Sequence, residues 1–139
     1  MSTRLKDKEK KILQLIEALA EESAKGKPII VEGKKDVAAL RTLGIAGMML
    51  TVKTGGKSFL DTVSEIEKIN APEVILMLDF DRRGKEGTKC LKQNLEIAKI
   101  KPNVKFWRLL STRVEKEIQC VESLTAYLDN LHAKISAQR

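Results

Sequence analysis

Three acidic residues stand directly after two short apolar runs, and their types and spacing suit the binding of a divalent cation. Glu32 follows the run 28–31, and Asp79 and Asp81 follow the run 73–78. Mg²⁺ prefers carboxylate oxygens and usually combines one or two protein carboxylates with a substrate phosphate. The two aspartates alternate along the chain, so in a straight strand both would face the same side. Glu32 would serve as a further ligand or as a general acid or base.

Glycine follows both acidic segments, at Gly33 and Gly84. Glycine allows the backbone to approach a phosphate closely, which fits a site of this kind. A structural alternative exists for Glu32 and Asp81, because an acid placed after a strand commonly caps the next helix. Three acids stand at two strand ends, and a glycine follows at each strand end. This pattern favours a metal or phosphate site over helix capping alone.

Basic residues and a glycine loop surround these acids in the sequence. Cationic side chains bind phosphates, and backbone N–H groups in a glycine turn do the same. The loop 54–58 lacks the spacing of a P-loop, which excludes nucleotide triphosphate hydrolysis by that route. Its alternative role is a plain glycine turn before a helix. The candidate nucleic-acid contacts are Lys34, Lys35, Lys53, Gly55, Gly56, Lys57, Arg82 and Arg83.

The elements that must position these residues alternate between strand and helix. Apolar runs predict strands at 28–31, 48–52, 73–78 and 104–110. Periodic patterns predict helices at about 4–25, 35–43, 59–69, 86–100 and 115–133. This alternation predicts an α/β fold with a parallel sheet, whose strands all end at one edge. We assign residues 1–27 to an N-terminal amphipathic helix and residues 28–139 to one domain that includes the C-terminal helix.

Composition limits the partners and the environment. The formal net charge of +7 and the pI near 9.5 suit a polyanion such as nucleic acid, although a solvated lysine-rich surface is the alternative. No apolar run approaches the ~20 residues of a membrane span. The amino terminus has no signal-peptide apolar core, so we expect a cytoplasmic protein without a membrane partner.

The scarce residue types exclude other site chemistries. His132 is the single histidine, which argues against a histidine metal site or a Ser-His-Asp triad. Cys90 and Cys120 are expected to be reduced, buried thiols on helices. Most of the aromatic side chains that could stack on bases should lie in the core, so we expect recognition through the nucleic-acid backbone. These aromatic residues are Phe59, Phe80, Phe106 and Trp107.

Taken together, three motifs resemble the Toprim pattern. They are Glu32-Gly33 after the first strand, the Thr-Gly-Gly loop after the second, and the Asp-x-Asp-x-x-Gly run of 79–84 after the third. Toprim domains occur in type IA and type II topoisomerases, bacterial-type primases, OLD-family nucleases, RecR proteins and ribonuclease M5. The resemblance covers roughly residues 28–110, and the chain looks like a small stand-alone archaeal or bacterial member, most similar to the ribonuclease M5 and primase-like versions.

The resemblance implies a fold, a cofactor and a chemistry. It implies a Rossmann-like Toprim fold with a four-stranded parallel sheet between helices. It also implies Mg²⁺, with Mn²⁺ as an alternative, near Asp79 and Asp81, and Glu32 as general acid or base in phosphodiester chemistry. Topoisomerases need a nucleophilic tyrosine on a separate domain. The one tyrosine here, Tyr127, is expected on the C-terminal helix and in the core of the protein. The chain lacks the length and the zinc ligands that primases need.

Two functions therefore stay open from the sequence. The first is an Mg²⁺-dependent nuclease that hydrolyses phosphodiesters in structured RNA, with RNA favoured over DNA. The second is a noncatalytic nucleic-acid-binding or scaffolding module with protein partners in an RNA-processing or DNA-repair complex. In that case the helices at 4–25 or 115–133 would dock the partners.

Overall fold

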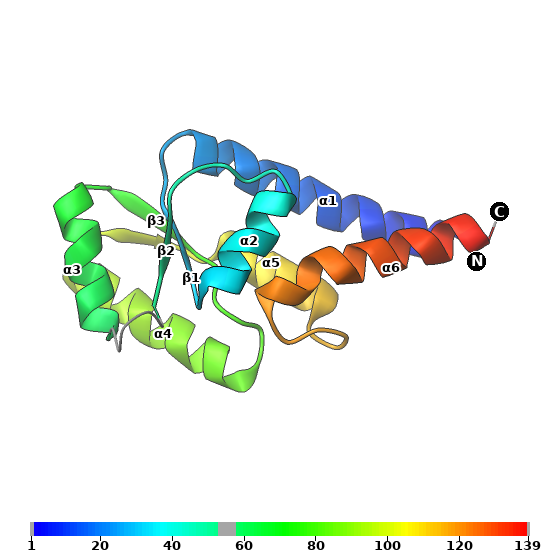
Figure 1. The fold of residues 1–139 in the computed structure, drawn as a ribbon. Helices are drawn as coiled ribbons and strands as arrows, with labels where there is room; N and C mark the ends of the chain where they lie inside the picture. Colours follow the sequence, from blue (N-terminus) through cyan, green and yellow to red (C-terminus); the bar gives the residue numbers. More distant parts are fainter. Residues whose placement is uncertain (1, 53–57, 139) are drawn as a thin grey trace.

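A computed structural model describes residues 2–52 and 58–138 (Figure 1). Four short strands form one parallel sheet in the order β2-β1-β3-β4. The strands are β1 (Ile29–Val31), β2 (Met49–Thr51), β3 (Glu73–Leu76) and β4 (Lys101–Asn103). The helices are α1 (Ser2–Ala24), α2 (Lys34–Thr42), α3 (Phe59–Ile69), α4 (Arg82–Ile97), α5 (Lys105–Val114) and α6 (Leu124–Ala137), with a 3₁₀ turn, η2 (Val121–Ser123), before α6.

The sheet separates two hydrophobic layers, because successive side chains of a strand point to opposite faces. On one face Ile29 and Ile75 pack with α1, α2, α5 and α6. On the other face Ile30, Val74 and Leu76 pack with α3 and α4. Both central strands are thus buried on both sides, as is usual for parallel sheets. The predicted α/β class, with a four-stranded parallel sheet between helices, is confirmed.

The helix α1 follows from its apolar stripe. Ile12, Ile16 and Leu19 recur at helical spacing and are buried against the sheet layer. The helix ends before Gly26, whose φ of +96° is a left-handed conformation that favours glycine. Figure 1 shows α1 and α6 running side by side beyond the sheet, with the start of α1 close to the end of α6. We call residues 2–13 of α1 together with α6 the helical arm.

The fourth strand differs from the prediction. Residues 105–110, predicted as strand, belong to helix α5, and the strand β4 is the preceding segment 101–103. The aromatic and aliphatic run of 104–110 permits either structure, but Phe106, Leu110 and Val114 recur every four residues and are buried together. The strand β4 contains Pro102, which a sheet tolerates at its edge.

The C-terminal helix begins later than predicted. Residues 115–120 form a turn and an irregular loop rather than helix, and α6 starts at Leu124. The carbonyl oxygen of Gln119 in this loop accepts a hydrogen bond from the distant Phe80 N–H, whereas inside a helix it would accept the N–H four residues later. Tyr127 lies half-buried on α6, packed against the core.

The cysteine prediction is partly wrong. Both cysteines are free thiols, but Cys90 is exposed on α4 and Cys120 is half-buried in the loop before η2. Of the aromatic residues, Phe80 and Phe106 are buried, whereas Phe59 and Trp107 are half-buried. Within 2–52 and 58–138, every helix is too short or too polar to cross a bilayer.

Candidate metal and nucleic-acid site

The two central strands bring the first pair of acids together. The chain leaves β1 towards β2 on one side and later returns to place β3 on the other side of β1. In open α/β sheets such a reversal creates a crevice at the carboxyl ends of the strands, where ligands bind. Glu32 directly follows β1, and Asp79 lies just beyond β3. The backbone N–H of Asp79 donates to Glu32 Oε2 at 3.4 Å, so the two residues are adjacent across 47 positions of sequence.

Asp81 has a structural role at the start of α4. It is the N-cap of this helix, and its Oδ1 accepts a hydrogen bond from the Gly84 N–H at 2.7 Å. The capping role considered for Asp81 is therefore confirmed. It is wrong for Glu32, because Gly33 is the N-cap residue of α2 and the Asp36 carboxylate accepts the Gly33 N–H at 3.0 Å.

Gly84 is required by packing within the protein. A Cβ at this position would lie 2.0 Å from the carbonyl oxygen of Asp79, which is closer than any two such atoms approach. A Cβ at Gly33, in contrast, would meet open space. Trp107 Nε1 donates to the carbonyl oxygens of Leu78 at 2.9 Å and Asp79 at 3.3 Å. The backbone at Asp79 is therefore fixed from two sides.

A segment near the C-terminal end of the chain completes the site. We call residues 119–122 the closing segment. The Phe80 N–H donates to the carbonyl oxygen of Gln119 at 2.7 Å, and the Val121 N–H donates to Asp79 Oδ1 at 3.4 Å. The Glu122 N–H donates to Asp36 Oδ1 at 2.9 Å. The closing segment thus connects the residues after β3 with the first turn of α2.

Asp36 was missed by the sequence reasoning. Its side chain is only 5% exposed and accepts two backbone hydrogen bonds. Its position in the first turn of α2, on the same helical face as the buried Ala39 and Leu40, is the signal that could have identified it. The closing segment carries no such signal, because its contacts use the backbone.

Electrostatics distinguish Asp36 from the other acids. Burial raises the pKa of the Asp36 carboxyl, although the N–H donors of Gly33 and Glu122 act in the opposite direction. The charges of Glu122 and Glu32 raise this pKa further. Close to the site, the Lys85 ammonium donates to Glu115 at 2.9 Å and lowers the pKa of that carboxyl.

The donor chemistry of the carboxylates fits a hard cation. Glu32 and Asp79 are adjacent, and the second oxygen of Asp81 takes no part in a hydrogen bond within the described residues. Within these residues, no three histidine, cysteine or acidic side chains form a group already arranged for a metal ion. Mg²⁺ needs only one or two protein carboxylates when a substrate phosphate supplies other ligands. The three-carboxylate arrangement stays a prediction.

Four of the predicted phosphate contacts flank these acids. Lys34 and Lys35 are exposed in the first turn of α2, and Arg82 and Arg83 are exposed in the first turn of α4. Arg82 Nε lies 3.4 Å from Glu86 Oε1. The other four, Lys53, Gly55, Gly56 and Lys57, lie outside the described residues.

A hollow of about 380 Å³ lies next to Asp81. It adds two cations that the sequence reasoning did not select, Lys85 and Lys116. Its remaining lining comes from Phe80, Arg82, Glu115 and Gln119. The site therefore offers acids at the strand ends and cations along the adjoining surface, an arrangement that can hold a metal ion and a phosphate side by side.

Comparisons with known proteins agree with this arrangement. The family model described as Toprim domain matches residues 26–109. A UPF0292 protein of Archaeoglobus fulgidus is 34% identical over 88% of this chain and 93% of its own length. A UPF0292 protein of Methanocaldococcus jannaschii is 38% identical over 86% of this chain and 91% of its own length.

A solved structure, of a putative protein from Aquifex aeolicus, has the same architecture. It superposes with a TM-score of 0.66 at 26% identity and covers 79% of this chain and 94% of its own. The Toprim resemblance is confirmed by these matches. Glu32, Asp36, Asp79 and Asp81 lie inside the matched residues, whereas the closing segment lies outside them. A Toprim domain implies a metal-dependent role with nucleic acid.

Proposed function

This chain belongs to the Toprim family, and from that premise we propose that it is a Mg²⁺-dependent nuclease that hydrolyses phosphodiester bonds in structured RNA. The observation that carries the proposal is the contact between Glu32 and Asp79 at the carboxyl ends of neighbouring strands. We favour structured RNA because the motifs around Glu32 and the glycine loop resemble those of the ribonuclease M5 and primase-like Toprim domains.

Each acid has its own part in this proposal. Asp79 and Asp81 would hold the metal, with Mn²⁺ as an alternative ion, and Glu32 would contribute as a further ligand or in proton transfer. When bound, the metal supplies positive charge against the scissile phosphate. As general acid or base, Glu32 takes a proton from the attacking water or returns one to the leaving oxygen. The hydrogen bond from the Asp79 N–H would orient the Glu32 carboxylate for this proton transfer.

The basic residues position the substrate. Those of the first turns of α2 and α4 stand beside the acids and would bind phosphates on either side of the scissile bond. Such contacts recognise the backbone rather than the base sequence. The substrate contacts in this proposal are Lys34, Lys35, Lys53, Gly55, Gly56, Lys57, Arg82 and Arg83.

The test compares the wild type with Glu32→Gln on end-labelled structured RNA, single-stranded RNA and duplex DNA, with Mg²⁺ or Mn²⁺. We expect metal-dependent cleavage of structured RNA that falls by roughly 10²–10⁴-fold in Glu32→Gln, the usual contribution of a general acid or base. Binding of the RNA should stay within about twofold, because the substitution removes one charge and no phosphate contact. Asp79→Asn should raise the metal concentration needed for cleavage.

The control for these variants is Glu67→Gln, the same chemical change at an exposed position on α3. It should cleave like the wild type. Cleavage that is unchanged in both Glu32→Gln and Asp79→Asn would contradict the proposal that these acids form a nuclease site.

A noncatalytic scaffold is the second candidate, and the helical arm favours it, because the arm lies outside the residues that match the Toprim model. Tight RNA binding without cleavage, equal in the wild type and Glu32→Gln, would support this role in an RNA-processing or DNA-repair complex. Deleting residues 1–25 cannot test it, because Ile12, Ile16 and Leu19 fill the core. Substitutions of exposed arm residues such as Leu13, which is 46% exposed, test partner docking without removing the core.

A further inference from the structure

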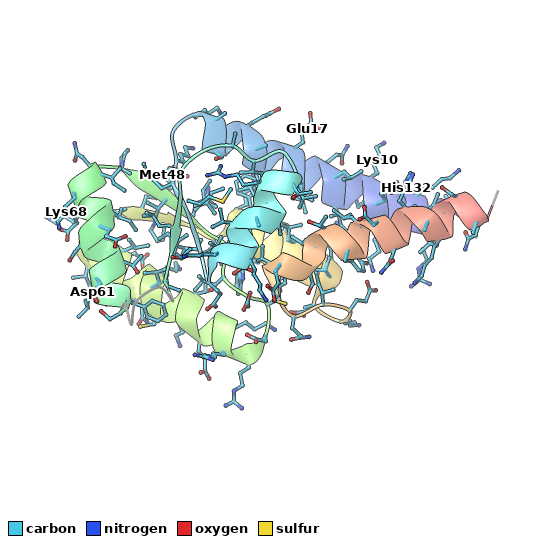
Figure 2. All side chains as sticks on the ribbon, viewed as in Figure 1. Lys10, Glu17, Met48, Asp61, Lys68 and His132 are labelled. Atoms are coloured by element: carbon cyan, nitrogen blue, oxygen red, sulfur yellow. The ribbon has the colours of Figure 1, made fainter. Side chains whose placement is uncertain are left out.

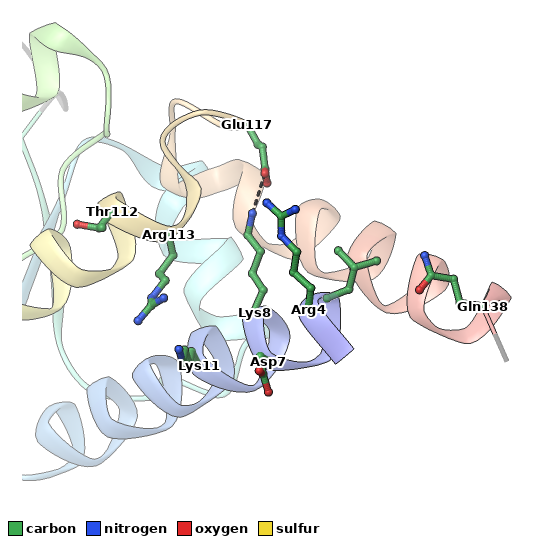
Figure 3. Close-up of a pocket in the computed structure, with 9 residues that line it drawn as sticks. Arg4, Asp7, Lys8, Lys11, Thr112, Arg113, Glu117 and Gln138 are labelled. Atoms are coloured by element: carbon green, nitrogen blue, oxygen red, sulfur yellow. Dashed lines mark hydrogen bonds and ion pairs between the residues drawn. The ribbon is translucent and has the colours of Figure 1, made fainter. Parts of the chain in front are cut away.

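A second basic hollow lies on the helical arm, apart from the carboxylates of the candidate site. It is a groove of about 670 Å³ between the first turns of α1 and the end of α5 (Figure 3). Four cationic side chains line it, together with two acids and shorter polar side chains. The cations are Arg4, Lys8, Lys11 and Arg113, and the acids are Asp7 and Glu117. We call this the arm groove.

The cations gather because of helical spacing and helix packing. Arg4, Lys8 and Lys11 are separated by four and three residues, so they share one face of α1. Arg113 comes from the last turn of α5, a helix that packs against α1. Figure 3 shows Arg113 reaching from α5 towards α1. Like charges placed side by side on a helix destabilise it unless an anion neutralises them.

Three of these cations are available to an external anion. Lys8 is occupied, because its Nζ lies 2.7 Å from Glu117 Oε1 and 5.6 Å from the centroid of the Tyr127 ring. Within the described part of the chain, the side chains of Arg4, Lys11 and Arg113 make no hydrogen bond or ion pair. The internal acids therefore neutralise one cation and leave the others for a ligand.

The arm groove and the hollow beside Asp81 are lined by neighbouring residues of one segment. Thr112, Arg113 and Glu117 line the arm groove, and Glu115, Lys116 and Gln119 line the hollow beside Asp81. The one short segment 112–119 thus borders both hollows. A polyanion that extends from the carboxylates over Lys116 would follow this segment towards the arm groove.

We infer that the arm groove binds the phosphates of the same nucleic-acid strand or duplex whose backbone lies at the carboxylate site. The nature of the polyanion rests on the proposed function. The surface itself is not part of the family match, because its residues lie at 4–11, 112–117 and 138, outside 26–109. It gives this chain a second phosphate-binding surface, which extends the contact beyond the scissile bond.

The test measures binding of structured RNA and duplex DNA to the full chain as a function of salt, without metal. Lys11→Glu and Arg113→Glu are compared with Lys68→Glu, an exposed lysine on α3 far from the arm (Figure 2). Each groove variant should weaken binding by about tenfold at 0.1 M salt and should lower the salt slope by about one, the result of losing one phosphate contact. Lys68→Glu should bind like the wild type, and circular dichroism melts should confirm that all variants fold.

The outcomes separate the two proposals. Groove variants that bind like the wild type, or a loss shared equally with Lys68→Glu, would overturn the arm groove. If cleavage still depends on Glu32 in that case, the proposed nuclease function stands alone. A selective loss of binding in the groove variants supports the arm groove even if no RNA is cleaved. Polyglutamate of matched charge serves as the competing probe, and binding of this peptide through the same residues as tightly as RNA would overturn the inference in favour of an acidic protein.

Discussion

The carboxyl edge of the sheet and the helical arm use the same kinds of side chain in different ways. At the sheet edge, backbone N–H groups hold the carboxylates of Glu32, Asp36 and Asp79. On the arm, side chains hold one another or a neighbouring side chain, as in the Lys8–Glu117 ion pair at 2.7 Å and the contact of His132 Nδ1 with Glu9 Oε2 at 2.9 Å. A backbone donor is placed by the fold, whereas an exposed side chain must lose conformational freedom to form a pair. The edge should therefore be sensitive to small changes and the arm tolerant of them.

The largest effect is expected where the backbone at the sheet edge is most closely packed. Gly84→Ala should lower the free energy of unfolding by about 3 kcal/mol, because the new methyl group cannot fit beside the Asp79 carbonyl without moving it. Gly33→Ala is the matched control, and its effect should stay within about 1 kcal/mol because a Cβ there meets open space. Urea unfolding measures both values. Equal losses in the two variants would mean that Gly84 is not held by this contact.

The second prediction concerns Asp36. Asp36→Asn keeps the size of the side chain but leaves one of its two N–H partners without an acceptor, which should cost about 1–3 kcal/mol of unfolding free energy. Asp129→Asn, the same change at an exposed position on α6, should cost little. Asp36 accepts the N–H groups of Gly33, next to Glu32, and of Glu122, next to the Val121 that contacts Asp79. Through these neighbours the substitution should also raise the metal concentration required for any activity, by about tenfold or more.

The pH dependence of Asp36 follows from its raised pKa. Between the ordinary value of 3.8 and the higher folded value, the folded state binds the proton more tightly than the unfolded state. Wild-type stability should therefore fall as the pH rises through this window, relative to Asp36→Asn. If the free energy of unfolding of the wild type instead rises with pH relative to that of Asp36→Asn, the pKa of Asp36 is not raised in the folded state.

Glu22, on the surface at the end of α1, should show the opposite pH dependence of stability, because its pKa is lowered rather than raised. Hydrogen bonds from Lys25 and Lys27 lower the pKa of its carboxyl from 4.5 to about 2. The stabilisation of the folded state by the ionised Glu22 should be complete above pH 4.5. It should disappear as the pH falls through about 2. The difference in Tm between wild type and Glu22→Gln, measured across this range, should shrink towards zero at the acid end. A difference that is independent of pH would exclude the charged pairs as its cause.

The smallest effect is expected on the arm. Glu117→Gln removes the partner of Lys8, but both side chains are partly exposed, at 28% and 45%, so the loss should be under about 1 kcal/mol. It should diminish further in 1 M salt, because screening weakens exposed ion pairs. Chemical unfolding at low and high salt measures this. A loss as large as that of Asp36→Asn would remove the contrast between arm and edge.

The sequence predicts the central part of this fold because its signals there are strong. The runs before Glu32 and Asp79 are continuous and apolar, so the strands, their order in the chain and the meeting of their carboxyl ends follow from general rules. The run 104–110 has no such clarity, because its aromatic and aliphatic residues fit either a strand or a helix. The helical repeat becomes clear only when Val114, beyond the run, is counted with Phe106 and Leu110. The capping role of Asp81 was one of two alternatives that the sequence left open.

The support of the candidate site could not be predicted. The N–H groups of Val121 and Glu122 contact residues 42 and 86 positions away. A backbone donor in an irregular loop has no characteristic side chain, so no pattern marks it. The arm groove shows the same limit, since Arg113 joins the cations of α1 only through the packing of α5.

The order of strands in the sheet also affects the sequence of events in folding. Strand β1 pairs with β2, but it pairs also with β3, which the chain reaches only after α3. Contacts between distant segments form slowly because the intervening chain must first be ordered. The Glu32–Asp79 contact and the closing segment should therefore be completed late during refolding, after the local helices. In hydrogen-exchange refolding experiments, the amides of Asp79, Val121 and Glu122 should gain protection after those of α3 and α4.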